Sequence, residues 1–161
     1  MEATDRSVIL RISWLYGLYG RNFVETMVDL FHEEELVSVV DDQIGSPTWS
    51  APLARSIVNR IICREDPCPA GIFHYQDGGS VSWYGFACGI LETARRCGAI
   101  HRPVELKPVD SSAFPAAAPR PRNSQFDTRK IRTRLGFPIH AWRKNLNRYF
   151  EQRGRSILCE R

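Results

Sequence analysis

The spacing of apolar residues along this chain follows two periods, one typical of strands and one typical of helices. Short apolar runs, rich in β-branched side chains, predict buried strands at Val8–Ile12, Leu36–Val40 and Gly71–Tyr75. Residues 104–109 are a weaker strand candidate, because Pro108 lacks the backbone N–H of a central strand and restricts this segment to a sheet edge or an early end.

The longer segments between and after these strands predict amphipathic helices. Helices are expected to begin at Asn22, Ser50 and Ser82, and to cover 127–135 and 142–150. Asn22 and Ser82 are suitable N-caps, Gly136 is a suitable stop, and the helix from Ser50 keeps its apolar period as far as Ile62. The first helix and its flanking strands give a strand-helix-strand unit over 8–40, the building block of a parallel sheet. Residues 153–161 are expected to be frayed.

Alternating strands and helices predict an α/β fold. The chain has 161 residues, of which 43% are hydrophobic, so it suits a single domain (1–161) that can close a core. Residues 110–125 are rich in Pro, Ala and Ser and hold no period, and composition alone indicates a flexible linker. Because a helical pattern follows it, this segment is expected to cross the surface between two anchored elements.

Charge and cysteine content narrow the classes of function. The 22 Lys and Arg residues against 18 Asp and Glu give a net charge of +4, which suits holding a phosphate better than coating a nucleic acid. Five cysteines, an odd number, without a secretory leader argue against a disulfide framework and predict a cytoplasmic protein. The sequence has no C-x-x-C pair and its four histidines are scattered, so we expect no metal site. It has no apolar run of membrane-spanning length, so we expect no membrane anchor.

The best local candidate for a ligand site is the stretch 36–49, where a β-branched strand ends in two carboxylates and a Gly/Ser/Pro turn. Open α/β folds bind ligands at the carboxyl ends of their strands. Gly45 allows a ligand to approach the backbone, and Pro47 stiffens the turn. Asp41 and Asp42 point to opposite faces, so we expect them to accept hydrogen bonds within the turn rather than act together on one substrate. An ordinary strand-loop-helix connection is the alternative.

Signals for catalysis and for cofactor binding are incomplete. Gly17 and Gly20 lie after a strand and before a helix, with Asp41 at the end of the next strand, which approaches a dinucleotide-binding fingerprint. Phe23 stands where a third glycine would let helix and strand touch. The sequence has no Tyr-x-x-x-Lys pair and no Gly-x-Ser-x-Gly elbow, so it offers no catalytic residue.

Two further features are candidates for binding a diphosphate and for stacking on a base or a sugar. Arg120 and Arg122 alternate with prolines, and a guanidinium offers a fork of donors that matches a diphosphate. A solvated basic linker is the alternative. Trp14 follows a buried strand and lies where the chain leaves the sheet, so its ring is a candidate to stack on a base or a sugar, whereas most other aromatic residues are expected to be core.

Taken together, these segments resemble the C-terminal part of dTDP-4-dehydrorhamnose reductases, members of the extended short-chain dehydrogenase/reductase superfamily. The resemblance is carried by LRISWLYG (10–17), Asn22-Phe23-Val24, SVVDDQIGSPTW (38–49), GIFHYQDGGSVSWYGFA (71–87) and FPAAAPRPRNSQFDTRK (114–130). It implies the C-terminal portion of a Rossmann-like parallel sheet plus a small α/β substrate-binding lobe. The Pro-rich segment 110–125 then becomes a substrate loop.

The resemblance also implies roles for individual residues. Trp14 would border the deoxysugar, the loop 43–48 would shape the nucleotide pocket, and Arg120 would face the diphosphate. The implied substrate-binding residues are Trp14, Asn22, Phe23, Gln43, Gly45, Pro47, Thr48, Arg120 and Asn123. Ile12 and Ser13 would lie near the cofactor, with Ile12 in the place of the usual threonine.

Full-length members of that family reduce the 4-keto group of dTDP-4-dehydro-L-rhamnose with NADPH or NADH, the last step of dTDP-rhamnose synthesis. Their glycine-rich cofactor loop and Tyr-x-x-x-Lys pair would lie upstream of Met1. We therefore expect this chain to bind a dTDP-sugar, to bind no cofactor tightly and to be inactive alone. A cofactor-binding half or a homo-oligomer would complete it, and an uncovered strand edge near Val8–Ile12 predicts self-association or a partner.

Two alternatives stay open. The chain could be a non-catalytic regulatory module, as in the methionine adenosyltransferase beta subunit, which resembles the same reductases. It could instead be a small dinucleotide-binding domain that uses Gly17 and Gly20. The nucleotide-sugar hypothesis has one structural requirement: the Pro/Arg segment and the Gly/Ser/Pro turn must share one cleft.

Overall fold

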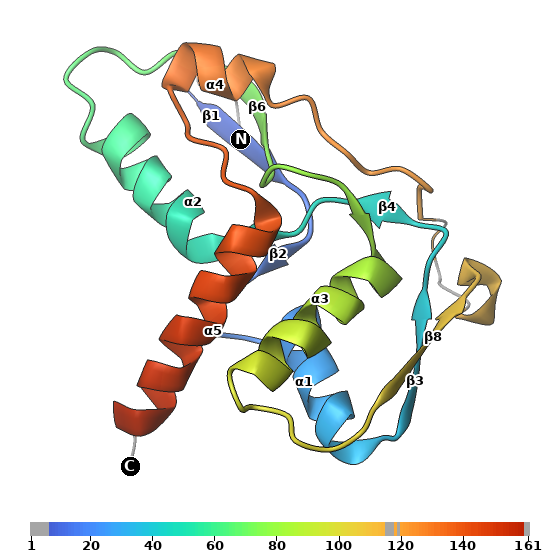
Figure 1. Ribbon diagram of the computed structural model, residues 1–161. Helices are drawn as coiled ribbons and strands as arrows, with labels where there is room; N and C mark the ends of the chain where they lie inside the picture. Colours follow the sequence, from blue (N-terminus) through green and yellow to red (C-terminus); the bar gives the residue numbers. More distant parts are fainter. Residues whose placement is uncertain (1–6, 115–117, 119, 160–161) are drawn as a thin grey trace.

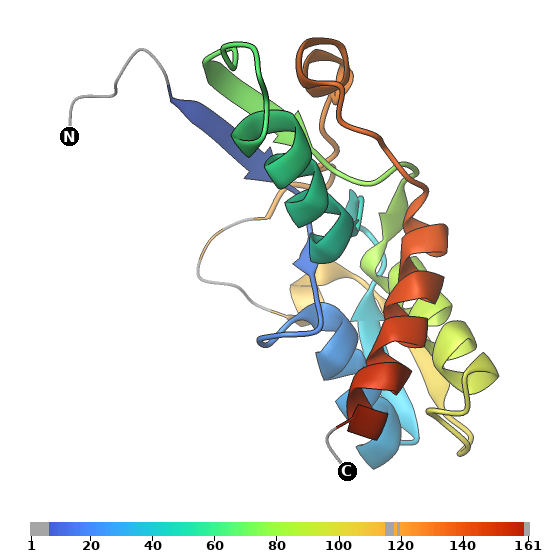
Figure 2. The same cartoon turned by 90° about the vertical axis from the view of Figure 1, so that its left-hand side faces the viewer.

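The computed structural model describes residues 7–114, 118 and 120–159 of the chain. They form two neighbouring groups of elements, each built on one pair of parallel strands with helices packed against it (Figure 1). In the view turned by 90°, the long C-terminal helix runs beside the helices of one group, and the strand pair of the other group lies toward the opposite end (Figure 2).

Each predicted strand is present. β1 (Val8–Ile12) pairs in parallel with β6 (Gly71–Tyr75), and β3 (Leu36–Val40) pairs in parallel with β8 (Glu105–Val109). Pro108 is tolerated inside β8, whose one partner among the described strands is β3. The chain therefore has the α/β fold that the alternation of elements predicts.

The prediction that 8–40 forms one strand-helix-strand unit of a single sheet is wrong, because β1 and β3 pair with different strands. The chain turns sharply at Trp14, whose φ of 40° is a left-handed conformation uncommon for a residue with a Cβ. Beyond this turn, β2 (Leu15–Tyr16) pairs with β5 (Thr48–Trp49). The turn takes the chain out of the β1–β6 pair before the first helix begins.

The larger core lies between α1 (Phe23–Glu33), α3 (Trp83–Arg96), α5 (Trp142–Cys159) and the β3–β8 pair. Its fully buried side chains include Val24, Val28, Phe31, Phe86, Ile90, Leu146 and Tyr149. The apolar face predicted for the last helix is thus buried, as expected for a helix stabilised by tertiary packing.

A smaller core lies between the β1–β6 pair, α2 (Ser50–Ile57) and α4 (Arg129–Leu135). Its buried members are Leu53, Phe73, Tyr75, Ile131, Leu135 and Phe137. α2 ends earlier than predicted and passes into the π-helical segment η1 (Val58–Ile62), where Val58 and Ile62 are exposed. The apolar period that starts at Ser50 therefore continues past the last residue that the core can cover.

Helix ends follow the local sequence. The Asn22 side-chain oxygen accepts hydrogen bonds from two amides in the first turn of α1, and the Ser82 hydroxyl oxygen accepts one in α3. Gly136 ends α4 with a left-handed φ of 65°. All three predicted signals are confirmed.

α5 continues through Cys159, past the point at which fraying was expected. Arg153 makes an ion pair with Glu25 of α1 at 2.9 Å, and both side chains are mostly buried, with exposed fractions of 21% and 24%. The Tyr149 hydroxyl donates a hydrogen bond to the same carboxylate. This ion pair anchors Arg153 to α1, whereas the fraying expected over the rest of 153–161 stays a prediction, and residues 160–161 lie outside the described part of the chain.

Candidate functional site

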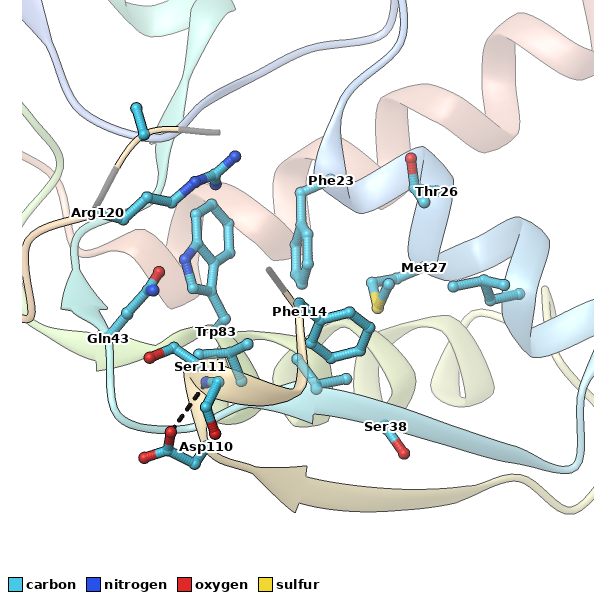
Figure 3. A pocket seen from close by; sticks show the side chains of 15 residues that line it. Phe23, Thr26, Met27, Ser38, Gln43, Trp83, Asp110, Ser111, Phe114 and Arg120 are labelled. Carbon is cyan, nitrogen blue, oxygen red and sulfur yellow. Dashed lines mark hydrogen bonds between the residues drawn. The ribbon is translucent and has the colours of Figure 1, made fainter. Parts of the chain in front are cut away.

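A pocket of about 1040 Å³ opens between α1, the end of β3, the start of α3 and the segment that follows β8 (Figure 3). Its apolar lining consists of Phe23, Met27, Leu30, Val39, Val40, Trp83, Phe114 and Ala118. Its polar lining consists of Thr26, Ser38, Gln43, Asp110, Ser111, Ser112 and Arg120. The pocket thus combines apolar side chains with polar groups, as small-molecule sites usually do.

Stacked aromatic rings make one wall of the pocket rigid. Trp83 stacks on Trp14 with the ring centroids 3.6 Å apart and the planes 9° from parallel. Phe23 packs against Trp83 at 4.5 Å between centroids. Trp14 is itself absent from the lining, so it supports the wall through Trp83 rather than facing the pocket.

The loop after β3 approaches this wall closely. Gly45 lies in β4 (Ile44–Gly45), which pairs with β7 (Val81–Ser82) just before α3. A Cβ atom on Gly45 would lie 2.4 Å from the Trp14 ring and 2.7 Å from the Ser124 hydroxyl oxygen. The close approach predicted at Gly45 is therefore made by protein side chains, and a ligand could not occupy the same place.

The Pro/Arg segment and the Gly/Ser/Pro turn meet. The Ile44 amide donates to the Arg122 carbonyl at 2.8 Å, and the Ser124 amide donates to the Ile44 carbonyl at 2.9 Å. Gln43 and Arg120, which flank these hydrogen bonds, both line the pocket (Figure 3). Both segments therefore contribute to one pocket, through Gln43 just before the Gly/Ser/Pro turn and through Arg120 in the Pro/Arg segment.

The other end of the Pro/Arg segment is anchored to the end of β3. The Asp42 carboxylate accepts hydrogen bonds from the Ser111 amide at 3.0 Å and from the Ser111 hydroxyl at 2.8 Å. Ser111 begins the 3-10 turn η2 (Ser111–Ala113). The Ser112 amide donates to Asp110, which lowers the pKa of this carboxyl group. Asp41 accepts instead from the Ser82 hydroxyl, so the two adjacent carboxylates face different partners, as expected.

Several implied site residues lie away from the pocket lining. Pro47 and Thr48 are buried in the loop, and the Thr48 amide donates to the Trp14 carbonyl at 3.0 Å. Asn22 uses its side-chain oxygen for the helix cap and its amide nitrogen for the carbonyls of Gly17 and Gly20. These three residues therefore shape the backbone around the pocket.

The remaining implied residues are Asn123, Ile12 and Ser13. Asn123 is exposed, and its side-chain oxygen accepts from the Gln125 amide. Ile12 ends β1 and packs in the smaller core. Ser13 follows it, and its buried hydroxyl has no hydrogen-bond partner among the described residues.

Sequence reasoning missed most of the apolar lining. Met27 and Leu30 lie on the apolar face of α1, which the sequence predicted only as an amphipathic helix, and Phe114 lies in the segment that composition indicated to be a linker. A helical period marks a residue as facing inward, but it does not distinguish a filled interior from a cavity. No local signal could have separated these residues from their buried neighbours.

Across the described residues, no group of three or more His, Cys, Asp and Glu side chains is placed to hold a metal ion. In the same part of the chain, no helix is both long and apolar enough to cross a membrane.

Residues 1–154 match the family model described as RmlD substrate binding domain. The chain belongs to this family. The dTDP-4-dehydrorhamnose reductase of Aggregatibacter actinomycetemcomitans is 36% identical over 157 residues, which cover 94% of this chain and 53% of the relative. The enzyme of the same name from Streptomyces griseus is 38% identical over 91% of this chain and 47% of its own length. The RmlD-type chain described here thus spans about half the length of these curated relatives.

Solved structures agree with this assignment. The crystal structure of dTDP-4-dehydrorhamnose reductase from Bacillus anthracis in complex with NADP is similar with a TM-score of 0.78 and 40% identity. The match covers 90% of this chain and 48% of that protein. The fold is therefore the α/β fold of the C-terminal part of these reductases, as the resemblance implied.

Proposed function

We propose that this chain is the substrate-binding half of a dTDP-4-dehydrorhamnose reductase and that its pocket holds a dTDP-sugar. The observation that carries the proposal is the convergence of Gln43 and Arg120, from segments far apart in sequence, on one pocket. A volume of about 1040 Å³ suits a large ligand such as a nucleotide-sugar.

Different residues of the pocket lining suit different parts of a dTDP-sugar. The Arg120 guanidinium matches the paired oxygens of a diphosphate. Trp83 and Phe23 offer aromatic surface for the flat thymine ring or for the apolar face of a sugar. Asp110, which also lines the pocket, would repel a diphosphate and suits a sugar hydroxyl, which can donate to it.

Hydride transfer needs a nicotinamide, which supplies the hydride when it is bound, and an acid to protonate the product alkoxide. Ser13 and Ile12 are the two residues implied to bind the cofactor. Ser13 fits cofactor binding in part, since its buried hydroxyl has no hydrogen-bond partner among the described residues. Ile12 offers no polar side-chain atom. We therefore expect these two residues alone to hold no cofactor tightly and hydride transfer to need a nicotinamide-binding part that they do not supply.

The surface of the β1–β6 pair suits such a partner. Ile9 and Ile72 lie side by side in the two strands, and their exposed fractions are 49% and 40%. A paired apolar surface of this kind gains free energy when a cofactor-binding half or a second copy of the chain covers it.

The start of α1 is poorly suited to bind the pyrophosphate of a dinucleotide, as the dinucleotide alternative would require. A pyrophosphate there would need the free amides of the first turn. Asn22 already accepts hydrogen bonds from the Val24 and Glu25 amides at 3.1 and 3.3 Å. This occupied cap supports placing the nucleotide in the pocket instead.

Calorimetric titration with dTDP tests the proposal. Arg120→Ala removes charge-assisted hydrogen bonds, which should weaken binding by about tenfold or more. Arg129→Ala, which removes an exposed arginine paired with Asp127, is the matched control and should leave binding unchanged. Equal effects of the two variants, or no dTDP binding by the unmodified chain, would contradict the proposal. Binding of NADPH alone would favour the dinucleotide alternative, and binding of neither ligand would favour a regulatory module.

A further inference from the structure

A buried carboxyl group connects the pocket loop to the rest of the fold. Asp77 follows β6 and is fully buried, with an exposed fraction of 0%. Its Oδ2 atom accepts hydrogen bonds from the Asn145 side-chain amide at 2.7 Å and from the Trp49 backbone amide at 3.2 Å. Its Oδ1 atom accepts from the Tyr75 hydroxyl at 3.4 Å. One side chain thus contacts β6, α5 and β5.

The environment of Asp77 is unusual for a carboxylate. Among the described residues, no ion pair is made to it. Burial raises its pKa, while the hydrogen bonds from Asn145 and Trp49 and the nearby His140 act in the opposite direction. Tyr16 and Tyr75 face the same group, and burial followed by the Asp77 charge raises the pKa of both hydroxyls. Burying a carboxyl group costs free energy of folding unless the group is well hydrogen-bonded, so a role for these contacts would explain why the group is there.

The contacts of residue 77 lie at both ends of a short part of the pocket loop. The Ser46 hydroxyl donates to the Asp77 backbone carbonyl, and the Trp49 amide donates to the Asp77 side chain. Between these two points, the Thr48 amide holds the carbonyl of Trp14, whose ring supports Trp83 in the pocket wall.

The residue before Asp77 holds the second pocket segment. The Gln76 side-chain oxygen accepts from the Phe126 amide at 2.9 Å, just after the Pro/Arg segment. The turn that ends β6 therefore fixes both chain segments that converge on the pocket.

We propose that Asp77 is a positioning residue for the pocket: its carboxyl group fixes the backbone at Trp49 and thereby the Trp14–Trp83 stack and the approach of Gln43. Asp77 touches no ligand in this account. The link to nucleotide binding rests on the proposed function, whereas the link to the loop and to the stacked rings does not.

Two substitutions separate positioning from general stability. Asp77→Ala removes the acceptor of the Trp49 amide. Asp77→Asn keeps an oxygen for Trp49 and Asn145 and adds a donor toward Tyr75, whose hydroxyl has the Pro138 carbonyl at 3.4 Å as another acceptor. The conservative variant should therefore preserve the loop.

Amide hydrogen exchange of the full chain gives a readout without ligand. In Asp77→Ala, exchange at Trp49 should be about tenfold faster or more, since its buried amide loses its partner, while Ile90 inside α3 stays protected. The near-ultraviolet circular dichroism of the stacked tryptophans should decrease, and dTDP affinity should fall about tenfold. Asp77→Asn should keep all three values within about twofold. Glu92→Ala, at an exposed position of α3, is the control. If Asp77→Ala does not fold, Asp77→Ser takes its place.

The outcomes are distinct. Equal acceleration at Trp49 and Ile90 in Asp77→Ala would mean a general stability role and would overturn the inference. So would an unchanged Trp49, or an Asp77→Asn variant that behaves like Asp77→Ala. If Trp49 exchange and the tryptophan signal respond as expected but the unmodified chain binds no dTDP, the proposed function fails and the positioning role stands.

Discussion

Replacing Gly45 by alanine tests the packing that builds the pocket wall. The added methyl group would lie 2.4 and 2.6 Å from two atoms of the Trp14 ring and 2.7 Å from the Ser124 hydroxyl oxygen. All three distances are shorter than any tolerated carbon contact, so the Trp14 ring or the backbone of the loop must move. Trp14 cannot move far without losing its stack on Trp83.

Forcing an extra methyl group into a packed interior costs ~1–3 kcal/mol. For a chain of this length, a loss of about 2 kcal/mol lowers the melting temperature by roughly 4–8 °C. We expect this decrease for Gly45→Ala in thermal unfolding followed by circular dichroism. The near-ultraviolet signal of the two tryptophans should also weaken in the folded state, because the stack is displaced.

Gly154→Ala is a matched control for the same chemical change. Gly154 lies inside α5 with no neighbouring atom within 4 Å of an added Cβ. Alanine there should be neutral or stabilising by up to about 1 kcal/mol, since alanine favours the helix. A Gly45→Ala variant that melts at the unmodified temperature, or a Gly154→Ala variant that is destabilised as much, would contradict the close packing of Gly45 against Trp14.

Three further predictions concern stability and association. The folded chain holds the proton of Asp77 more tightly than the unfolded chain, since burial raises its pKa. The contribution of Asp77 to stability is therefore full below its unfolded-state pKa and is lost as pH rises through its folded-state pKa. Asp77→Asn should make the decline of the urea unfolding midpoint with rising pH less steep. A steeper decline in this variant would contradict a raised pKa in the folded state. Glu25→Ala should lower the free energy of unfolding in urea by about 1–3 kcal/mol, because it leaves the mostly buried Arg153 guanidinium without its partner. A decrease below about 0.5 kcal/mol would mean that this ion pair stabilises the fold no more than an exposed pair does. Light scattering should detect self-association of the chain at high concentration, and Ile9→Lys should reduce it. A monomer at every concentration would contradict the proposal that the exposed Ile9 and Ile72 side chains are covered by a partner.

The sequence predicted those parts of the fold that depend on a few neighbouring residues. The cap at Asn22 forms because an amide side chain and two helix amides lie within three positions of each other. Gly136 stops α4 because a glycine adopts the left-handed conformation at little cost. The apolar face of α5 and the four longer strands likewise follow from periods that are visible in one segment.

Tertiary structure decided what depends on distant segments. β1 pairs with β6 rather than joining β3, because the left-handed turn at Trp14 redirects the chain, and no local period encodes that turn. Met27 belongs to the larger core and also lines the pocket, because the segment after β8 comes back over α1 only in the folded chain.

The candidate site shows the same division. Arg120 and the loop 43–48 could be named from their residue types and from a family resemblance, since guanidinium chemistry and tight turns are properties of short segments. Asp77 could not be named in that way, because an isolated aspartate after a strand gives no sign of burial. Its role arises from Trp49 and Asn145, which only folding brings to it, since hydrogen bonds between distant segments depend on packing rather than on local sequence.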